Sequence, residues 1–161
     1  MTKLNKENYL IILLILSIIT LTSALVIEYG FGYKPCSLCI IERIPYGLAI
    51  IILILNYNFK QNQIFFSILL ILIFLFSILI SVYHFSIEQG FIDESAVCKS
   101  KNLNLITKDD ILNSLKELRI SCKDVAFKIF GFSLTFYNII LSILMFLLST
   151  KIDLFSKAIK K

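Results

Sequence analysis

Long stretches of apolar residues without a single charge recur along the chain. Residues 9–27 and 64–82 form two such stretches of 19 residues each, and residues 129–148 form a third. A helix needs roughly 20 mainly apolar residues to cross the hydrocarbon core of a bilayer. These stretches are apolar on every face, unlike the helices of soluble proteins, which are apolar along one stripe. Each of them therefore predicts a membrane-spanning helix.

A shorter uncharged stretch covers residues 44–55. It would extend only about 18 Å as a helix, against a hydrocarbon core of roughly 30 Å. We expect this span to begin earlier, near Cys36, because Pro35 suits the first turn of a helix. Pro45 lies inside the expected helix and should bend it near the interface. The stretch therefore predicts a second, bent span that starts at or just after Cys36.

The pattern as a whole predicts an all-α membrane protein: an antiparallel bundle of four transmembrane helices in one domain, residues 1–161. We expect spans at about 9–27, 40–56, 64–83 and 130–149, joined on the outer side by loops 28–39 and 84–129. In the second loop, Thr107 followed by Asp110 is an N-cap pattern. Four apolar residues then share one helical face, which predicts a short amphipathic helix: Ile111, Leu112, Leu115 and Leu118. It would lie on the membrane interface or pack on the span ends.

Composition agrees with a membrane protein. The chain is 58% hydrophobic, with a mean hydropathy of +0.86, whereas soluble domains are about 45–50% apolar. The first stretch exceeds the roughly 7–15 residues of a secretory signal core, and further spans follow, so we expect it to be retained.

The net charge of +5 comes from scattered lysines without a binding motif, which argues against nucleic acid as a partner. Seven Lys lie on the side of the termini and nine Lys or Arg on the other, so charge does not set the orientation.

Four cysteines fall in the two outer loops, on one side of the membrane. Cys36 and Cys39 form a C-x-x-C pair, and Cys98 and Cys122 are 24 residues apart. A structural zinc site usually needs two closely spaced ligand pairs, so we expect no metal. Two inert disulfides are a second alternative, but a C-x-x-C loop is too small to give much entropic stabilisation. The close pair is better suited to thiol–disulfide exchange.

Local spacing suggests how the C-x-x-C pair is activated. If Cys36 lies in the first helical turn, the helix dipole stabilises its thiolate. Arg43 follows Cys39 by four residues and could stabilise a thiolate there. An arginine near the hydrocarbon edge is a functional candidate by default. The alternative for Arg43 is structural: a salt bridge with Glu42 or with a lipid phosphate.

Three segments resemble the DsbB family of bacterial membrane disulfide-forming (thiol:quinone) oxidoreductases. The run from Lys34 to Arg43, with the order C-x-x-C-x-x-E-R, resembles the first outer loop of this family. Tyr83-His84 with Glu88 resembles the segment that leaves the third span. Ser121-Cys122 followed by Phe130-Gly131-Phe132-Ser133 resembles the entry to the fourth span. The resemblance covers order, spacing and topology over residues 9–150.

The resemblance implies an electron relay. A periplasmic thioredoxin-fold (DsbA-like) oxidant would be reoxidised by a Cys98–Cys122 disulfide, with Cys98 attacked by the partner and Cys122 linking to Cys36. Cys36–Cys39 would reoxidise that pair and pass the electrons to ubiquinone or menaquinone, with Cys39 and Arg43 beside the ring. The protein would lie in the bacterial inner (cytoplasmic) membrane with its cysteine loops in the periplasm.

Two residues keep alternative interpretations. His84 resembles a residue near the quinone in the family, and it could equally cap the third span or form local hydrogen bonds. Glu88 is expected to be a solvated interface residue. Neither is decided by its position in the sequence.

Other functions are compatible with four spans and four cysteines. A vitamin K epoxide reductase-like protein would carry its loop cysteines before the C-x-x-C pair, whereas here the pair comes first. A non-enzymatic four-span membrane subunit with structural disulfides would bind no quinone. An oxidase dedicated to one partner enzyme cannot be told from a general one by sequence.

Overall fold

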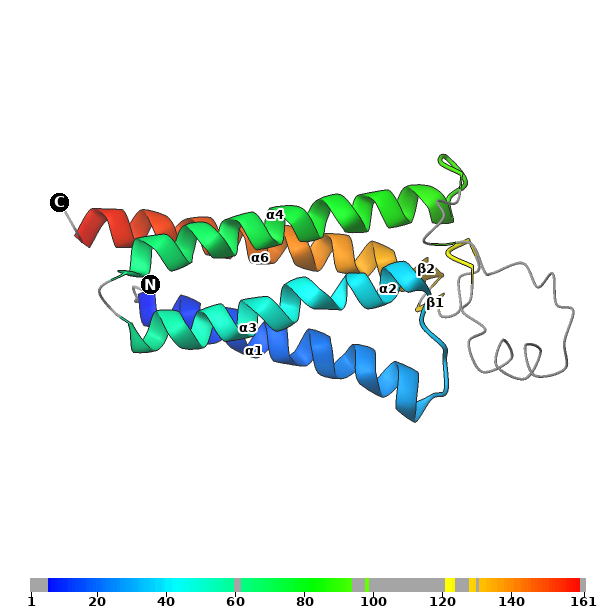
Figure 1. The fold of residues 1–161 in the computed structure, drawn as a ribbon, viewed down its shortest axis with the longest axis horizontal. Coiled ribbons are helices and arrows are strands. Elements are labelled where there is room, and N and C mark those ends of the chain that lie inside the picture. The colour runs from blue at the N-terminus through cyan, green and yellow to red at the C-terminus, as the bar shows by residue number, and fades with distance from the viewer. Residues whose placement is uncertain are drawn as a thin grey trace, which may run out of the picture.

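The protein is described by a computed structural model over residues 6–59, 62–93, 98, 121–123, 128–129 and 131–159. Four helices within these residues are long and apolar enough to cross a membrane: Glu7–Gly30, Ser37–Asn58, Gln63–Glu88 and Leu134–Leu154. Consecutive spans run in opposite directions along the molecule (Figure 1). The prediction of an all-α antiparallel four-helix membrane bundle is confirmed.

The four spans are built from six helical elements, two of which are short. The first span is α1 (Lys6–Leu25), which continues as a π-helical segment, η1 (Val26–Gly30). The second span consists of α2 (Ser37–Ile41) and α3 (Arg43–Asn58). The third is α4 (Gln63–Glu88), and the fourth is α6 (Leu134–Ile159). Two short strands, β1 (Lys128–Ile129) and β2 (Phe132–Ser133), precede α6.

The second span is interrupted at Glu42, between α2 and α3. Pro45 explains the break, because it has no N–H to donate to the carbonyl of Ile41, four residues earlier, and its ring crowds that carbonyl. The interruption lies about one turn before the proline. It places Glu42 at a helix junction, where the residue is only 8% exposed and its side chain contacts His84 and Asn138.

Several helix ends differ from those expected: the first span covers residues 6–30, the fourth helix ends at Ile159 and not near residue 149, and two further ends bear on the site. The third helix continues to Glu88 instead of ending near residue 83, so His84 and Glu88 lie on a helix and not in the loop. The fourth helix begins at Leu134 instead of residue 130, because β1 and β2 pair antiparallel, with Lys128 opposite Ser133. Gly131, at a φ of 85°, provides the left-handed turn between the strands. The amphipathic helix predicted after Thr107 lies outside the described residues.

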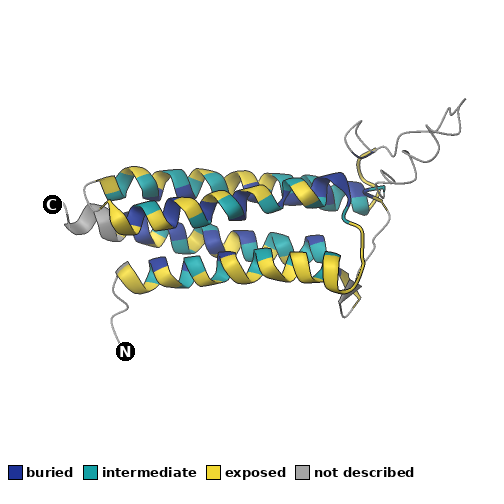
Figure 2. Cartoon of the chain, turned by 60° about the horizontal axis from the view of Figure 1, so that its bottom comes forward, coloured by how far each residue is buried: buried dark blue, intermediate teal, exposed yellow. Residues whose placement is uncertain are grey.

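The burial pattern is that of a bundle surrounded by lipid. Large apolar side chains are exposed along the outer faces of the helices, such as Ile19, Phe65 and Leu79 (Figure 2). The interior contains Phe74 and Met145 together with six fully buried serines: Ser17, Ser67, Ser77, Ser81, Ser142 and Ser149. Small residues let membrane helices approach closely, so the serines mark the faces where the helices pack.

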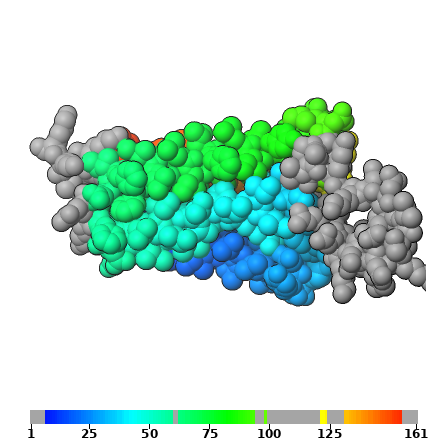
Figure 3. All heavy atoms as spheres, viewed as in Figure 1, coloured from blue at the N-terminus to red at the C-terminus, as the bar shows by residue number. Residues whose placement is uncertain are grey.

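The arrangement of the helices brings the described parts of the outer connections to one end of the bundle. α4 packs along α6, and α1 packs along α3; α3 and α4 lie side by side over the length of the molecule (Figure 3). α2, the end of α4 and the two strands gather at the end opposite to the start of α1 (Figure 1). The described cysteines therefore meet at one end of the bundle.

Candidate redox site

Cys36 and Cys39 are placed by the start of α2. Cys36 is the N-cap residue of this helix, with an extended backbone (φ −72°, ψ 169°), and its Sγ accepts a hydrogen bond from the Cys39 N–H at 3.1 Å. An N-cap side chain normally satisfies a free N–H of the first turn, and here sulfur takes that role. Both cysteines are free thiols. The structure therefore shows the dithiol form of the pair.

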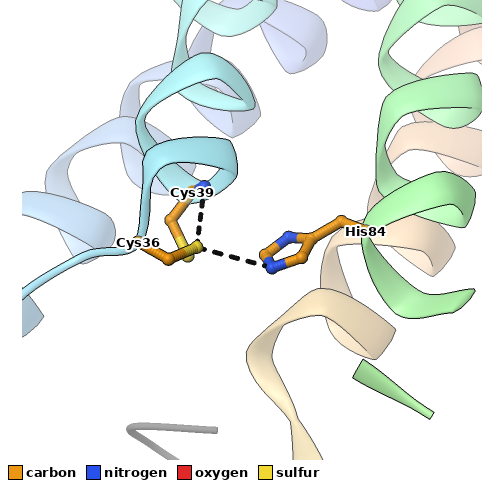
Figure 4. Close-up of side chains that lie close together, drawn as sticks. All are labelled: Cys36, Cys39 and His84. Atoms are coloured by element: carbon orange, nitrogen blue, oxygen red, sulfur yellow. Dashed lines mark hydrogen bonds between the residues drawn. The ribbon is translucent and has the colours of Figure 1, made fainter. Parts of the chain in front are cut away.

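His84, on α4, faces the thiol of Cys36 (Figure 4). Its Nε2 lies 3.4 Å from Cys36 Sγ, and its Nδ1 lies 2.9 Å from Glu42 Oε1. His84 and Glu42 are both buried. With Nδ1 donating to the carboxylate, Nε2 is left to accept a proton from sulfur, which is the arrangement of an activated thiol. Of the two roles left open for His84, a place in the site is the one that its contacts support.

The surroundings of Cys36 favour its thiolate. A hydrogen bond from the Cys39 side chain has the largest effect and, with His84 and the Cys39 N–H, lowers the pKa of Cys36 to about 5, although burial acts in the opposite direction. A thiolate is the nucleophile and the better leaving group in disulfide exchange. The contacts of Cys36 with Cys39 and His84 therefore favour a thiolate in the dithiol form.

Arg43 is bound to a partner that the sequence analysis did not consider. Its guanidinium forms an ion pair with Glu28 of η1, and both side chains are about one-fifth exposed. Glu42, the partner named as its structural alternative, is hydrogen-bonded instead to His84 and Asn138. Arg43 and Cys39 line the same cavity. Glu28 could have been suspected from sequence, since it is a lone acid at the end of an apolar stretch.

The loop cysteines form a disulfide that packs against the C-x-x-C pair. Cys98 and Cys122 are bonded, with their Cα atoms 5.3 Å apart. Both are buried, and they share one apolar cluster with Cys36 and Leu38 of the second span. The structure thus brings together the four cysteines that the sequence separates by up to 86 positions.

A cavity of about 340 Å³ opens beside the C-x-x-C pair. Its walls come from α1 and α6, as Leu16, Ile19 and Leu141, and its polar end comes from Cys36, Cys39, Glu42, Arg43 and His84. Small-molecule sites are typically about 300–1,000 Å³, mostly apolar, with a few convergent polar groups. The cavity has both the size and the polarity of such a site.

Glu88 differs from its expected state as a solvated residue. It is half-buried, accepts a hydrogen bond from Ser133 Oγ at 2.7 Å and lines the cavity. The cause is the extra turn of α4, which carries Glu88 to the strand that precedes α6. Glu88 therefore ties α4 to β2.

A chain of buried and partly buried hydrogen bonds leads from Glu42 into the bundle. Asn138 on α6 donates to Glu42 Oε2 at 3.0 Å and to Ser81 Oγ at 2.8 Å. The Tyr46 hydroxyl donates to Asn138 Oδ1 at 2.5 Å and lies 2.9 Å from Ser142 Oγ. We call Glu42, Asn138, Tyr46, Ser81 and Ser142 the polar ladder. Sequence reasoning missed Asn138 and Tyr46, although a polar residue inside an apolar span is itself a functional indication.

These features define a class: a four-span membrane protein with a thiol–disulfide centre at one end of its bundle. The chain belongs to the DsbB family, because the sequence model of that family, described as "Disulfide bond formation protein DsbB", matches residues 6–152. It is similar to the uncharacterized protein RP370 of Rickettsia prowazekii (strain Madrid E), with 34% identity over 148 residues that cover 87% of this chain and 85% of that protein. No solved structure matches the chain. The protein is thus a multi-pass membrane oxidoreductase of disulfide-bond formation.

Proposed function

We propose that the protein reoxidises a periplasmic thioredoxin-fold (DsbA-like) disulfide donor and passes the electrons to a membrane quinone. The observation that carries this proposal is the packing of the Cys98–Cys122 disulfide in the same buried cluster as Cys36. Disulfide exchange requires a thiolate to reach the sulfur of a disulfide. The shared cluster supports such an exchange, because it keeps the two pairs close together.

The exchange would proceed by four sulfur displacements. A partner thiolate attacks Cys98, and Cys122 leaves as a thiolate. Cys122 attacks Cys36 of an oxidised Cys36–Cys39 pair, and Cys39 leaves as a thiolate. The partner's second thiolate then releases Cys98 and leaves the partner oxidised. Cys98 attacks Cys122, which re-forms the loop disulfide and releases Cys36. Two electrons have moved, and the remaining dithiol is the form that the structure shows.

His84 and Glu42 would manage the proton of Cys36. The low pKa of Cys36 makes it a good leaving group when Cys98 attacks the mixed disulfide. His84 Nε2, at 3.4 Å, can take up the proton of the thiol, and Glu42 holds the ring in the required orientation and stabilises its charge. The buried position of all three keeps this proton away from bulk water.

The cavity fits a quinone as the electron acceptor. Its apolar walls on α1 and α6 suit an isoprenoid chain, and its polar end suits a ring that carries two carbonyl oxygens. Arg43 and His84 would hold the ring, and the charge of Arg43 would stabilise negative charge on a ring oxygen. A quinone, when bound, accepts two electrons and two protons. Ubiquinone and menaquinone both satisfy these contacts.

The proposed location is the bacterial inner membrane, with the cysteine end of the bundle in the periplasm. Disulfides persist in oxidising compartments, whereas cysteine thiols are kept reduced in the cytosol. A disulfide that has to be re-formed in every turnover is therefore best placed on the periplasmic side.

The test is quinone reduction by the purified protein supplied with a reduced thioredoxin-fold partner. We expect steady turnover, which Cys36→Ser abolishes. Cys98→Ser and Cys122→Ser should also stop turnover with the protein partner but spare a rapid reaction of Cys36–Cys39 with a small dithiol. Full turnover in Cys36→Ser would disprove the relay.

A further inference from the structure

The three groups Cys36, Cys39 and His84 form a cluster with the chemistry of a metal site. One ligand atom from each, the two sulfurs and an imidazole nitrogen, all lie within 4.8 Å of one another. Cys36 Sγ and His84 Nε2 are 3.4 Å apart. With bond lengths of about 2.3 Å to sulfur and about 2.0 Å to nitrogen, a tetrahedral ion requires a separation near 3.5 Å. The observed distance therefore already matches two bonds to one ion.

We propose that the dithiol form of the protein binds Zn²⁺ through Cys36, Cys39 and His84. This inference does not depend on the proposed function. Zinc is favoured among divalent ions because it combines readily with thiolate and imidazole ligands in a tetrahedral arrangement. The sequence predicted no metal, because the four cysteines do not form two closely spaced ligand pairs. His84 is 45 residues after Cys39 in the chain, and only the packing of α4 brings it to the pair.

The surroundings of His84 support this role. Its Nδ1 is held at 2.9 Å by the carboxylate of Glu42, so that Nε2 points toward the cysteines. Metal-binding histidines usually have such a carboxylate behind them, which fixes the ring and raises its basicity. Glu42 in turn accepts a hydrogen bond from Asn138 at 3.0 Å. The orientation needed for a metal ligand is therefore present before any ion arrives.

Binding of this kind depends on the redox state of the pair. Two thiols lose their protons to solvent when zinc binds, and the ion itself is neither oxidised nor reduced. A Cys36–Cys39 disulfide has no thiolate to offer, so oxidation removes two of the three ligands. All three ligand residues line the cavity, from which a water molecule can supply the fourth ligand. Zinc would thus hold the protein in its reduced form by occupying both sulfurs.

The test uses Co²⁺ as a spectroscopic substitute for Zn²⁺ in the full chain, purified without a polyhistidine tag. The protein carries Cys98→Ser and Cys122→Ser, so that only the C-x-x-C pair can supply sulfur. Titration of the reduced protein should give thiolate-to-cobalt charge-transfer absorption and the intense visible bands of tetrahedral cobalt. The bands should saturate at one ion per chain and disappear when Zn²⁺ is added.

Three controls separate this site from chance binding. The same protein with Cys36–Cys39 oxidised should show no bands, and this control needs no further substitution that could impair folding. Glu42→Gln should weaken cobalt binding about 10- to 100-fold. Glu88→Gln removes a carboxylate that lines the same cavity but is bonded to Ser133, so it should leave the affinity unchanged.

Other results would overturn the proposal. Equal binding by the oxidised protein would place the ion elsewhere. Unchanged bands in a folded His84→Ala protein would show that the chain's only histidine is not a ligand. The absence of charge-transfer absorption from the reduced protein would exclude the site altogether. None of these results bears on disulfide exchange, so they leave the proposed function to its own test.

Discussion

Cys36 has contacts of two kinds that favour its thiolate. Hydrogen bonds from Cys39 act within one turn of α2, while His84 reaches it from another helix. The local contacts follow from the C-x-x-C spacing and could be anticipated. The contact with His84 depends on how α4 is rotated and extended, and spacing along the chain carries no information on either.

We predict that His84→Asn raises the pKa of Cys36 from about 5 toward its usual range. The hydrogen bond and the positive charge of His84 are lost, while the contacts from Cys39 remain, so the rise should be partial. In the wild-type protein the thiolate is present above about pH 5; in the variant it should form at a higher pH. The ultraviolet absorption of the thiolate, followed against pH in the reduced Cys98→Ser/Cys122→Ser protein, measures the shift. An unchanged midpoint would show that His84 does not act on Cys36.

Variants of Arg43 can show whether its positive charge stabilises the bound electron acceptor or the folded protein. We predict that Arg43→Ala lowers quinone-dependent turnover about 10- to 1000-fold, the scale of removing one electrostatic stabiliser. Exchange between Cys98–Cys122 and the protein partner should stay near normal. Arg43→Lys keeps the charge but loses the planar fork, so it should retain partial activity.

The ion pair with Glu28 provides the control for this prediction. Removing Arg43 leaves the Glu28 carboxylate without its partner, which could itself disturb the cavity. The double variant Arg43→Ala/Glu28→Gln removes that charge as well. Slow turnover in the double variant supports a direct role for Arg43, and recovered turnover assigns the loss to Glu28. A matching fall in both half-reactions would point to a structural role.

At the scale of the helices, the polar ladder joins the second, third and fourth spans. Asn138 of α6 is hydrogen-bonded to Glu42 between α2 and α3, to Tyr46 of α3 and to Ser81 of α4. Without it, the buried carboxylate and hydroxyl lose partners that lipid cannot replace. One amide therefore links three spans near the redox site.

We predict that Asn138→Leu lowers the free energy of unfolding by about 1–3 kcal/mol, the cost of leaving buried polar groups unsatisfied. Equilibrium unfolding in detergent micelles measures the change. Thr150→Val is the matched control, because Thr150 is on the same helix and its hydroxyl donates an exposed hydrogen bond to the carbonyl of Leu147, within that helix. Equal stability of the two variants would contradict the role given to the ladder.

Sequence patterns predict which segments of this chain form helices, but not where every helix begins and ends. Uncharged apolar stretches predict the four helices, because lipid demands length and apolarity of any span. They do not predict the end of a helix that continues into polar residues. The third helix does so, because His84 and Glu88 form hydrogen bonds with residues of neighbouring elements. The apolar stretches also misplace the start of α6, since Phe130 and Phe132 look like helix residues although Gly131 turns the chain into a hairpin.

The candidate site likewise contains residues that the sequence groups together and contacts that the sequence does not predict. Cys36, Cys39 and Arg43 are close in sequence, so helical spacing suffices to group them. The contacts that complete the site are all between helices: Glu28 with Arg43, and Glu42 with His84. Such pairs depend on helix rotation and crossing, which apolar stretches do not encode.

For the whole molecule, the grouping of the cysteines at one end makes orientation decisive. We predict that a membrane-impermeant thiol reagent applied from the periplasmic side labels reduced Cys98 in a Cys122→Ser variant. Cys98 is only 2% exposed, so labelling should be slow compared with that of a surface thiol. The double variant Cys98→Ser/Cys122→Ser gives the background from Cys36 and Cys39. Labelling that requires opening of the inner membrane would place the cysteine end in the cytoplasm.

The cavity beside the cysteines has walls made by membrane-spanning helices, α1 and α6. We therefore expect an occupant that dissolves in the membrane to reach the cavity sideways from one leaflet, without passing through water. The quantity that sets its occupancy is then the number of such molecules per lipid, not per litre of buffer. Diluting a vesicle suspension with buffer should leave the occupancy unchanged, while fusing the vesicles with empty lipid should reduce it in proportion to the added membrane.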